Sequence, residues 1–116
     1  MPEHPMPVTA VIAQDERETV VTLAGELDAA GRDEAERALV EAEQAEPRRL
    51  VIDIRELTFI DSAGITCVLR ARERAGEAQH HLRVLAREDG QPAEVFRICG
   101  LDSLLEFEEG SAPAQA

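Results

Sequence analysis

Stretches typical of β-strands alternate with stretches that have the spacing of helices along this 116-residue chain, and this alternation limits the fold more than any other feature. Residues 8–13 alternate weakly, as in an edge strand, and residues 19–23 are rich in β-branched side chains. Residues 50–54 form a nearly continuous apolar run, as expected of a strand covered on both faces. Residues 82–86 are another candidate for a buried strand, and residues 104–107 for a last one.

Three helices are predicted between these strands, each from apolar residues at helical spacing. The apolar residues are, in turn, Ala35, Ala38, Leu39 and Ala42; Ile65, Val68 and Leu69; and Pro92, Val95, Phe96 and Cys99. The predicted order is therefore β-β-α-β-α-β-α-β. It indicates a single α/β domain with a mixed, mostly parallel β-sheet and α-helices packed on it.

Composition removes several classes of function. The net charge is −12, and all 12 basic residues are arginines. Without lysine the chain has neither a phosphate-loop lysine nor a Schiff base. The acidic excess opposes binding to phosphate backbones, and the absence of tryptophan and tyrosine leaves almost no side chain on which bases could stack. Nucleic acid is therefore not an expected partner.

The domain is expected to span residues 8–108, with flexible tails at 1–7 and 110–116. No apolar run approaches the roughly 20 residues needed to cross a bilayer, and the start does not resemble a signal peptide. A cytoplasmic protein without a membrane partner is therefore expected. Cys67 and Cys99 are predicted to be reduced thiols in the core. Neither these thiols nor the adjacent His80 and His81 have the spacing of metal ligands, so neither a metal nor a cofactor is expected.

The segment from Ile60 to Ile65 reads Ile-Asp-Ser-Ala-Gly-Ile and lies where a strand passes into a helix. This position places the Ser62 hydroxyl at a helix N-terminus, where unpaired N–H groups and the helix dipole tolerate a phosphate. Phosphorylation would add about −1.5 to −2 charges at neutral pH. The carboxylates of Asp61 and of Asp28, on another loop, would repel this added charge. A second interpretation is that Asp61 or Ser62 only caps the helix. The two roles are compatible.

A small serine hydrolase acting through Ser62 is a further alternative. A nucleophile elbow requires Gly-x-Ser-x-Gly after a strand, and here Ile60 replaces the first glycine. His80 and His81 follow Ser62, but the only carboxylates between them are Glu73 and Glu77, on or just past the predicted helix. This chemistry is the least favoured.

Four segments together resemble the STAS domain and, more narrowly, the bacterial anti-sigma-factor antagonists, or anti-anti-sigma factors. They are residues 20–28, which end in Gly-Glu-Leu-Asp; residues 50–54; residues 59–65, which contain Asp-Ser-Ala-Gly-Ile; and residues 100–102. The Asp-Ser-Ala-Gly-Ile segment after an Asp-bearing strand is the most specific of the four. The resemblance covers roughly residues 8–108.

The resemblance implies a partner-switching phosphoprotein of bacterial signalling and transcription regulation, not an enzyme. In that family the unphosphorylated antagonist binds an anti-sigma factor, which is also a serine kinase, and so frees the sigma factor. Phosphorylation of the serine that matches Ser62 ends the binding, and a phosphatase removes the phosphate and so restores the binding form. The implied partner-binding residues are Asp28, Asp61, Ser62, Ala63 and Gly64.

Other STAS roles are a scaffold subunit of a stressosome-like assembly and an accessory subunit of a lipid transporter, and the oligomeric state is left open. Two features depart from the family pattern. The usual helix after the last strand has no counterpart beyond Glu109, and Gly31 near the start of the first helix is expected to cost up to about 1 kcal/mol of helix propensity.

Overall fold

The computed structural model describes residues 6–110. Within them, five strands and four helices follow the order β1-β2-α1-β3-α2-β4-α3-α4-β5. The strands are β1 Thr9–Gln14, β2 Thr19–Leu27, β3 Arg49–Ile60, β4 His81–Arg87 and β5 Phe107–Gly110. The helices are α1 Arg32–Glu43, α2 Ser62–Ala78, α3 Gln91–Ile98 and α4 Leu101–Leu104.

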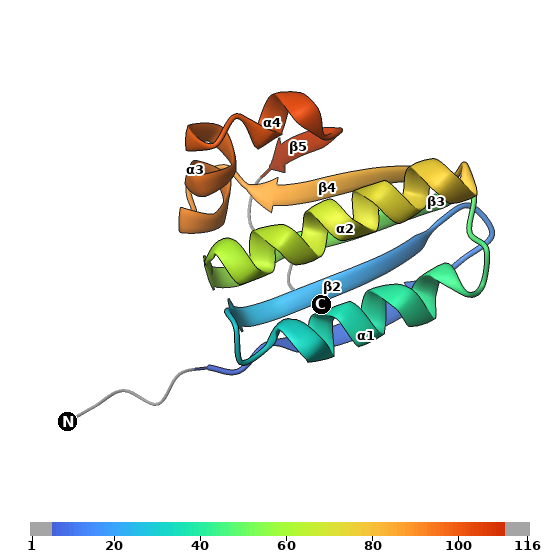
Figure 1. Ribbon diagram of the computed structural model, residues 1–116, viewed down its shortest axis with the longest axis horizontal. Helices are drawn as coiled ribbons and strands as arrows, with labels where there is room; N and C mark the ends of the chain where they lie inside the picture. Colours follow the sequence, from blue (N-terminus) through green and yellow to red (C-terminus); the bar gives the residue numbers. More distant parts are fainter. Residues whose placement is uncertain (1–5, 111–116) are drawn as a thin grey trace.

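The strands form one sheet in the order β1-β2-β3-β4-β5, so each strand neighbours the next one along the chain. β1 is antiparallel to β2, and the other three pairs are parallel. Figure 1 shows α1 and α2 side by side in front of the sheet. The predicted α/β class and mixed, mostly parallel sheet are confirmed, with the short α4 as the one added element among the described residues.

The core lies between one face of the sheet and the helices. Alternate side chains of β2, β3 and β4 are buried on that face: Val21, Leu23, Leu50, Ile52, Ile54, Val84 and Ala86. α1 and α2 lie against it through alanines, Ala35, Ala38, Ala71 and Ala75, and small residues let a helix lie close to a sheet. α3 covers the same face further along, where Phe96 stacks on Phe107 of β5 with ring centroids 5.0 Å apart.

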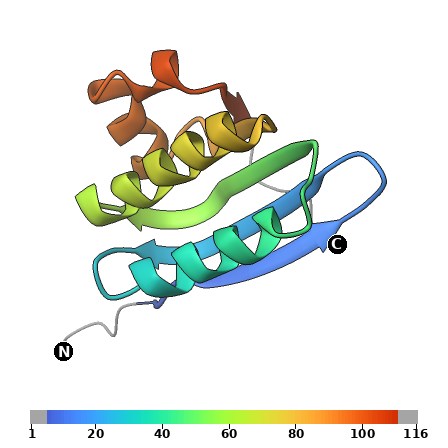
Figure 2. The ribbon, with the colours of Figure 1, turned by 45° about the vertical axis from the view of Figure 1, so that its right-hand side comes forward.

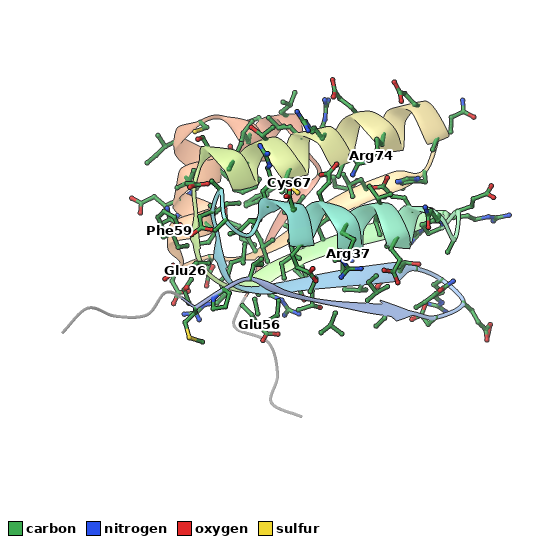
Figure 3. The ribbon with its side chains drawn as sticks, turned by 60° about the horizontal axis from the view of Figure 1, so that its bottom comes forward. Glu26, Arg37, Glu56, Phe59, Cys67 and Arg74 are labelled. Atoms are coloured by element: carbon green, nitrogen blue, oxygen red, sulfur yellow. The ribbon has the colours of Figure 1, made fainter. Side chains whose placement is uncertain are left out.

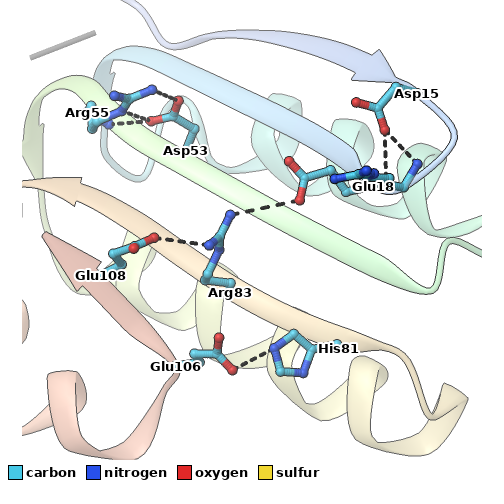
Figure 4. Close-up of polar contacts among 9 residues, drawn as sticks. Asp15, Glu18, Asp53, Arg55, His81, Arg83, Glu106 and Glu108 are labelled. Atoms are coloured by element: carbon cyan, nitrogen blue, oxygen red, sulfur yellow. Dashed lines mark hydrogen bonds and ion pairs between the residues drawn. The ribbon is translucent and has the colours of Figure 1, made fainter. Parts of the chain in front are cut away.

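The opposite face of the sheet carries polar and charged side chains, drawn in Figure 4. The sequence predicts that β3 is covered on both faces, but α1, α2 and α3 all lie on one. Val51, on the open face, is nevertheless only 3% exposed. Its neighbour in β4, Arg83, reaches across β3 toward Glu18, with 3.8 Å between guanidinium nitrogen and carboxylate oxygen. A long charged side chain thus covers an apolar position that a second helical layer was expected to cover.

The C-terminal part differs from the prediction in detail. Gly100 adopts a left-handed conformation, φ 74°, which ends α3 and lets the chain turn into α4. The last strand therefore lies at residues 107–110 rather than 104–107. Cys99 is exposed at the end of α3, whereas Cys67 is buried. The prediction of a thiol in the core is therefore wrong for Cys99 and confirmed for Cys67.

The expected tails lie largely outside the described residues. Of the residues assigned to them, Met6 accepts a hydrogen bond from the Glu26 N–H at 2.9 Å, and Gly110 belongs to β5. Gly31 precedes α1 as its N-cap rather than lying inside it, so the expected loss of helix propensity does not apply. No helix in the part of the chain described here is long and apolar enough to cross a membrane.

Candidate functional site

Two loops meet at the carboxyl ends of β2 and β3. Leu27 and Ile60, the last residues of these parallel strands, are paired in register, so Asp28 and Asp61 leave the same edge of the sheet. The Asp61 N–H donates to the Leu27 carbonyl oxygen at 3.2 Å. The topology therefore places Asp28 beside the segment that contains Asp61 and Ser62.

Asp61, and not Ser62, caps α2. Asp61 is extended, with φ −120° and ψ −168°, and its Oδ1 accepts from the N–H groups of Ala63 at 2.9 Å and Gly64 at 3.3 Å. Ser62 is the first residue of the helix and is exposed. Its hydroxyl has no hydrogen-bond partner among residues 6–110, although its carbonyl oxygen accepts from Thr66 Oγ1 at 2.9 Å. The Ser62 hydroxyl is therefore not consumed by capping.

This division of roles predicts different effects of two substitutions at Asp61. Asp61→Ala should lower the free energy of unfolding by about 1 kcal/mol, because two N–H groups at the start of α2 lose their acceptor. Asp61→Asn should keep most of that stability, since an amide oxygen also accepts these bonds. Urea unfolding of both variants measures the difference. Equal losses would show that the carboxylate charge, rather than the cap, stabilises the helix start.

The charges around Ser62 are unbalanced. No charged side chain follows it on α2 until Arg70, so the first two turns offer no cation to a phosphate. Asp28 is held in its loop because its Oδ1 accepts from the Gly31 N–H at 3.1 Å. A phosphate on Ser62 would gain from the helix dipole but would lie next to the carboxylates of Asp61 and Asp28.

Gly64 sets the position of the helix start. It is buried, and an added Cβ would lie 2.6 Å from Ile60 Cγ1 and 2.8 Å from the Leu27 carbonyl oxygen. Only glycine lets α2 begin this close to β2 and β3. Gly64 therefore packs beneath the site, whereas the neighbouring Ala63 is half-buried and Ser62 is exposed.

Gln91 belongs to the site's framework but was missed from the sequence. Its side-chain amide brackets the end of β3: Oε1 accepts from the Ile60 N–H at 2.9 Å, and Nε2 donates to the Ile60 carbonyl oxygen at 3.0 Å. These bonds tie the start of α3 to the residue before Asp61. A glutamine just after a glycine at a helix start carries no signal for such a contact.

Phe59 was also missed as a surface residue. It is 39% exposed and pairs in register with Glu26 of β2. Figure 3 shows both side chains at the end of the sheet where α2 begins. Aromatic residues are enriched at protein-binding surfaces, so the exposed ring of Phe59 is a candidate contact residue. The alternation of β3 could have indicated it, because the next residue, Ile60, faces the core.

Cys67 lies one turn past the site between α1 and α2, and its surroundings make it unreactive. Its Sγ donates to Glu36 Oε1 at 3.4 Å, and the Glu36 carboxylate is paired with the Arg74 guanidinium at 2.8 Å. Burial, together with the Glu36 carboxylate, raises the pKa of Cys67 to about 12. The thiol therefore remains protonated at neutral pH, and this network joins the two helices.

The described histidines lie far from Ser62. His80 and His81 follow the other end of α2, whose 17 residues span about 25 Å. A cavity of about 370 Å³ lined by Arg49, His81 and Arg83 lies near them, at the opposite end of the sheet from Ser62. No group of three or more potential metal ligands occurs within residues 6–110. The geometry brings no general base to the Ser62 hydroxyl from these histidines.

Comparison with known proteins supports one family. The matching family model is described as "Mlab, STAS domain" and covers residues 10–106. Among solved structures, an anti-sigma factor antagonist from Mycobacterium paratuberculosis superposes with a TM-score of 0.82 at 23% identity, covering 94% of this chain and 92% of that one. The phosphorylated form of the Bacillus cell fate determinant SpoIIAA gives a TM-score of 0.66 at 20% identity, covering 89% of this chain and 92% of that one. A search of curated proteins found no significant match.

The chain belongs to the STAS domain family, since the family model spans nearly all of the fold. The solved structures show that it shares its fold with anti-sigma-factor antagonists.

Proposed function

We propose that this protein is an anti-sigma-factor antagonist that works as a phosphorylation switch. Its unphosphorylated form binds an anti-sigma factor that is also a serine kinase, and so releases the sigma factor. Phosphorylation of Ser62 ends that binding, and a phosphatase restores it. The observation that carries the proposal is the exposed Ser62 hydroxyl at the start of α2: Asp61 caps the helix, and within residues 6–110 the hydroxyl has no hydrogen-bond partner.

The surface proposed to bind the kinase consists of Asp28, Asp61, Ser62 and Ala63, with Gly64 holding the helix start beneath it. Phe59 adds apolar area at its border. An added dianion at the centre of such a surface would weaken binding through repulsion and the cost of desolvation, with no change of fold. The acidic residues favour a partner with a basic face, because complementary charge speeds association.

The comparisons support this reading at the level of the fold. One structural neighbour is an anti-sigma factor antagonist, and another, SpoIIAA, has been solved in both an unphosphorylated and a phosphorylated form. In the proposal the chain is a binding protein and a kinase substrate, not itself an enzyme, and it acts in the cytoplasm.

Intact-mass analysis after incubation with a candidate kinase and ATP tests the proposal. The wild type should gain the mass of one phosphate, and Ser62→Ala should gain none. Thr66→Ala is the matched control, because Thr66 is an exposed hydroxyl one turn further along α2 and should not alter the result. Phosphate on Thr58 or Thr66 instead of Ser62 would contradict the assignment.

A scaffold or transporter subunit is the second candidate. The matching family model describes the STAS domain in general and does not name anti-sigma-factor antagonists. It is therefore equally compatible with this alternative. Such a subunit would elute in a large complex on size-exclusion chromatography of a cell extract. A switch protein would elute as a small species, or with a kinase of modest size.

A further inference from the structure

The two edges of the sheet differ in how they are protected. In a chain with 31% charged residues, the six residues of β1, Thr-Ala-Val-Ile-Ala-Gln, include neither a charge nor a proline. β5, at the other edge, has four residues, and two of them are glutamates in ion pairs: Glu108 with Arg83 at 3.1 Å, and Glu109 with Arg97. Charges and short length are the usual protection of an exposed edge. β1 has neither.

The backbone groups on the free side of β1 follow from its pairing with β2. The Asp15 N–H donates to the Glu18 carbonyl oxygen at 3.0 Å, so Asp15 faces β2. Groups alternate along a strand, and the register pairs Ala13 with Val20 and Val11 with Thr22. Ala13 and Val11 therefore also face β2. The N–H and C=O groups of Ala10, Ile12 and Gln14 point away from the sheet.

The side chain of Val11 is exposed beside this edge. It is 63% exposed, although it is a β-branched apolar residue within a strand. Val11 pairs in register with Thr22, and Thr22 pairs with Asp53. Paired residues share a face, so the Val11 side chain lies on the open face of the sheet shown in Figure 4. Figure 2 shows β1, in blue, along the outer edge beyond α1.

We propose that a second copy of this chain covers this edge, through antiparallel pairing of β1 with the partner's β1 about a two-fold axis at Val11. In this register Ala10 lies opposite the partner's Ile12, and Ile12 opposite the partner's Ala10. Each such pair exchanges two backbone hydrogen bonds. The two Val11 side chains meet at a non-hydrogen-bonded position, where cross-strand side chains are closest.

The strand is complementary to itself at its ends as well. With Val11 on the axis, each residue of β1 from Thr9 to Ala13 lies opposite a residue of the same span in the partner, and none of these residues is charged. No like charges face each other, so two identical and strongly acidic chains can pair here without direct repulsion. This match favours a second copy as the occupant, and a two-fold interface closes without forming a fibre.

The pairing leaves the Ser62 site accessible. Ser62 follows β3, which β2 separates from the β1 edge. The inference therefore does not depend on the proposed function, and its failure would leave that proposal unaffected.

Sedimentation equilibrium across a dilution series tests the pairing. The wild type should have twice the 12.7 kDa chain mass at high concentration. Val11→Lys should remain at the single-chain mass, because two ammonium groups would face each other on the axis. Leu104→Lys is the matched control: it replaces an exposed apolar residue of α4 by the same cation, and it should dimerise like the wild type. The proposal would be overturned if the wild type stayed monomeric, which includes the case in which β1 pairs only with a different protein. A dimeric Val11→Lys variant would also overturn it.

Crosslinking tests the register. In a Cys99→Ser background, which removes the exposed thiol, Val11→Cys should form a covalent dimer under mild oxidation. Thr9→Cys, on the same strand and face, would lie opposite the partner's Ala13 and should crosslink poorly. Equal crosslinking of both variants would contradict pairing about Val11.

Discussion

Ser62→Asp is expected to weaken binding of the anti-sigma factor kinase by about 100-fold or more, whereas Ser62→Ala should bind as the wild type does. A carboxylate at this position adds charge beside Asp61 and Asp28, and an unpaired charge in an interface costs roughly 2–5 kcal/mol. The alanine variant removes a hydroxyl that has no partner among residues 6–110. Isothermal titration calorimetry of each variant against the kinase measures the two Kd values.

The fold should tolerate both substitutions, so a loss of binding can be assigned to the surface. An acidic residue in the first turn of a helix interacts favourably with the helix dipole, and alanine is the best helix former. Melting temperatures close to that of the wild type would verify this.

Net charge needs its own control, because the chain already has a charge of −12. Gln44→Glu adds one charge at the exposed C-terminal end of α1, away from Ser62, and should leave the Kd within about twofold, since exposed charges beyond a Debye length are screened. Equal affinities of the aspartate and alanine variants would exclude the switch. A similar loss for Gln44→Glu would show that overall charge, rather than the position of Ser62, controls binding.

The parts of the fold that repeat a periodic pattern could be predicted from sequence. α1 shows every predicted apolar position buried, because Ala35, Ala38, Leu39 and Ala42 recur at helical spacing and nothing competes with that pattern. The sequence places the strand at residues 82–86 within one residue of its observed bounds at each end, since a short, largely apolar run between two polar segments leaves little choice.

The errors have local causes that periodicity does not detect. Cys99 completes a helical stripe with Val95 and Phe96, yet α3 ends at Ile98 and the chain turns at Gly100, so the thiol is exposed. Residues 50–54 are apolar enough for a strand between two helical layers, but Arg83 and Glu18 cover Val51 instead of a helix. A side chain that reaches across a strand leaves no periodic signal.

At the candidate site, the sequence indicated which residues meet but not how they divide their roles. The motif placed Asp61 and Ser62 at a helix start and left either residue as the cap. The choice depends on backbone geometry, because the extended Asp61 directs its carboxylate back at the N–H groups of Ala63 and Gly64. The Gln91 bracket on Ile60 joins residues 31 positions apart and depends on the complete fold.

Gly64→Ala is expected to lower the free energy of unfolding by roughly 2–3 kcal/mol, because overpacking a well-filled contact costs about 1–3 kcal/mol and here one of the obstructing atoms is backbone. The added Cβ would lie 2.8 Å from the Leu27 carbonyl oxygen, which cannot rotate away, as well as 2.6 Å from Ile60 Cγ1. For a domain of this size the melting temperature should fall by about 10 °C.

Gly76→Ala on the same helix is the matched control, and it should have the opposite sign. Nothing lies within 4 Å of a Cβ built at Gly76, so alanine there should stabilise the protein by about 0.5–1 kcal/mol through helix propensity and a less flexible unfolded chain. Thermal unfolding of both variants compares one chemical change at two positions. Equal effects of the two substitutions would contradict the inference that the close approach of α2 to β2 and β3 holds Ser62 beside Asp28. If they differ as expected, Gly64→Ala should also bind the kinase more weakly at temperatures where it is still folded, because the displaced helix start carries Ser62 with it.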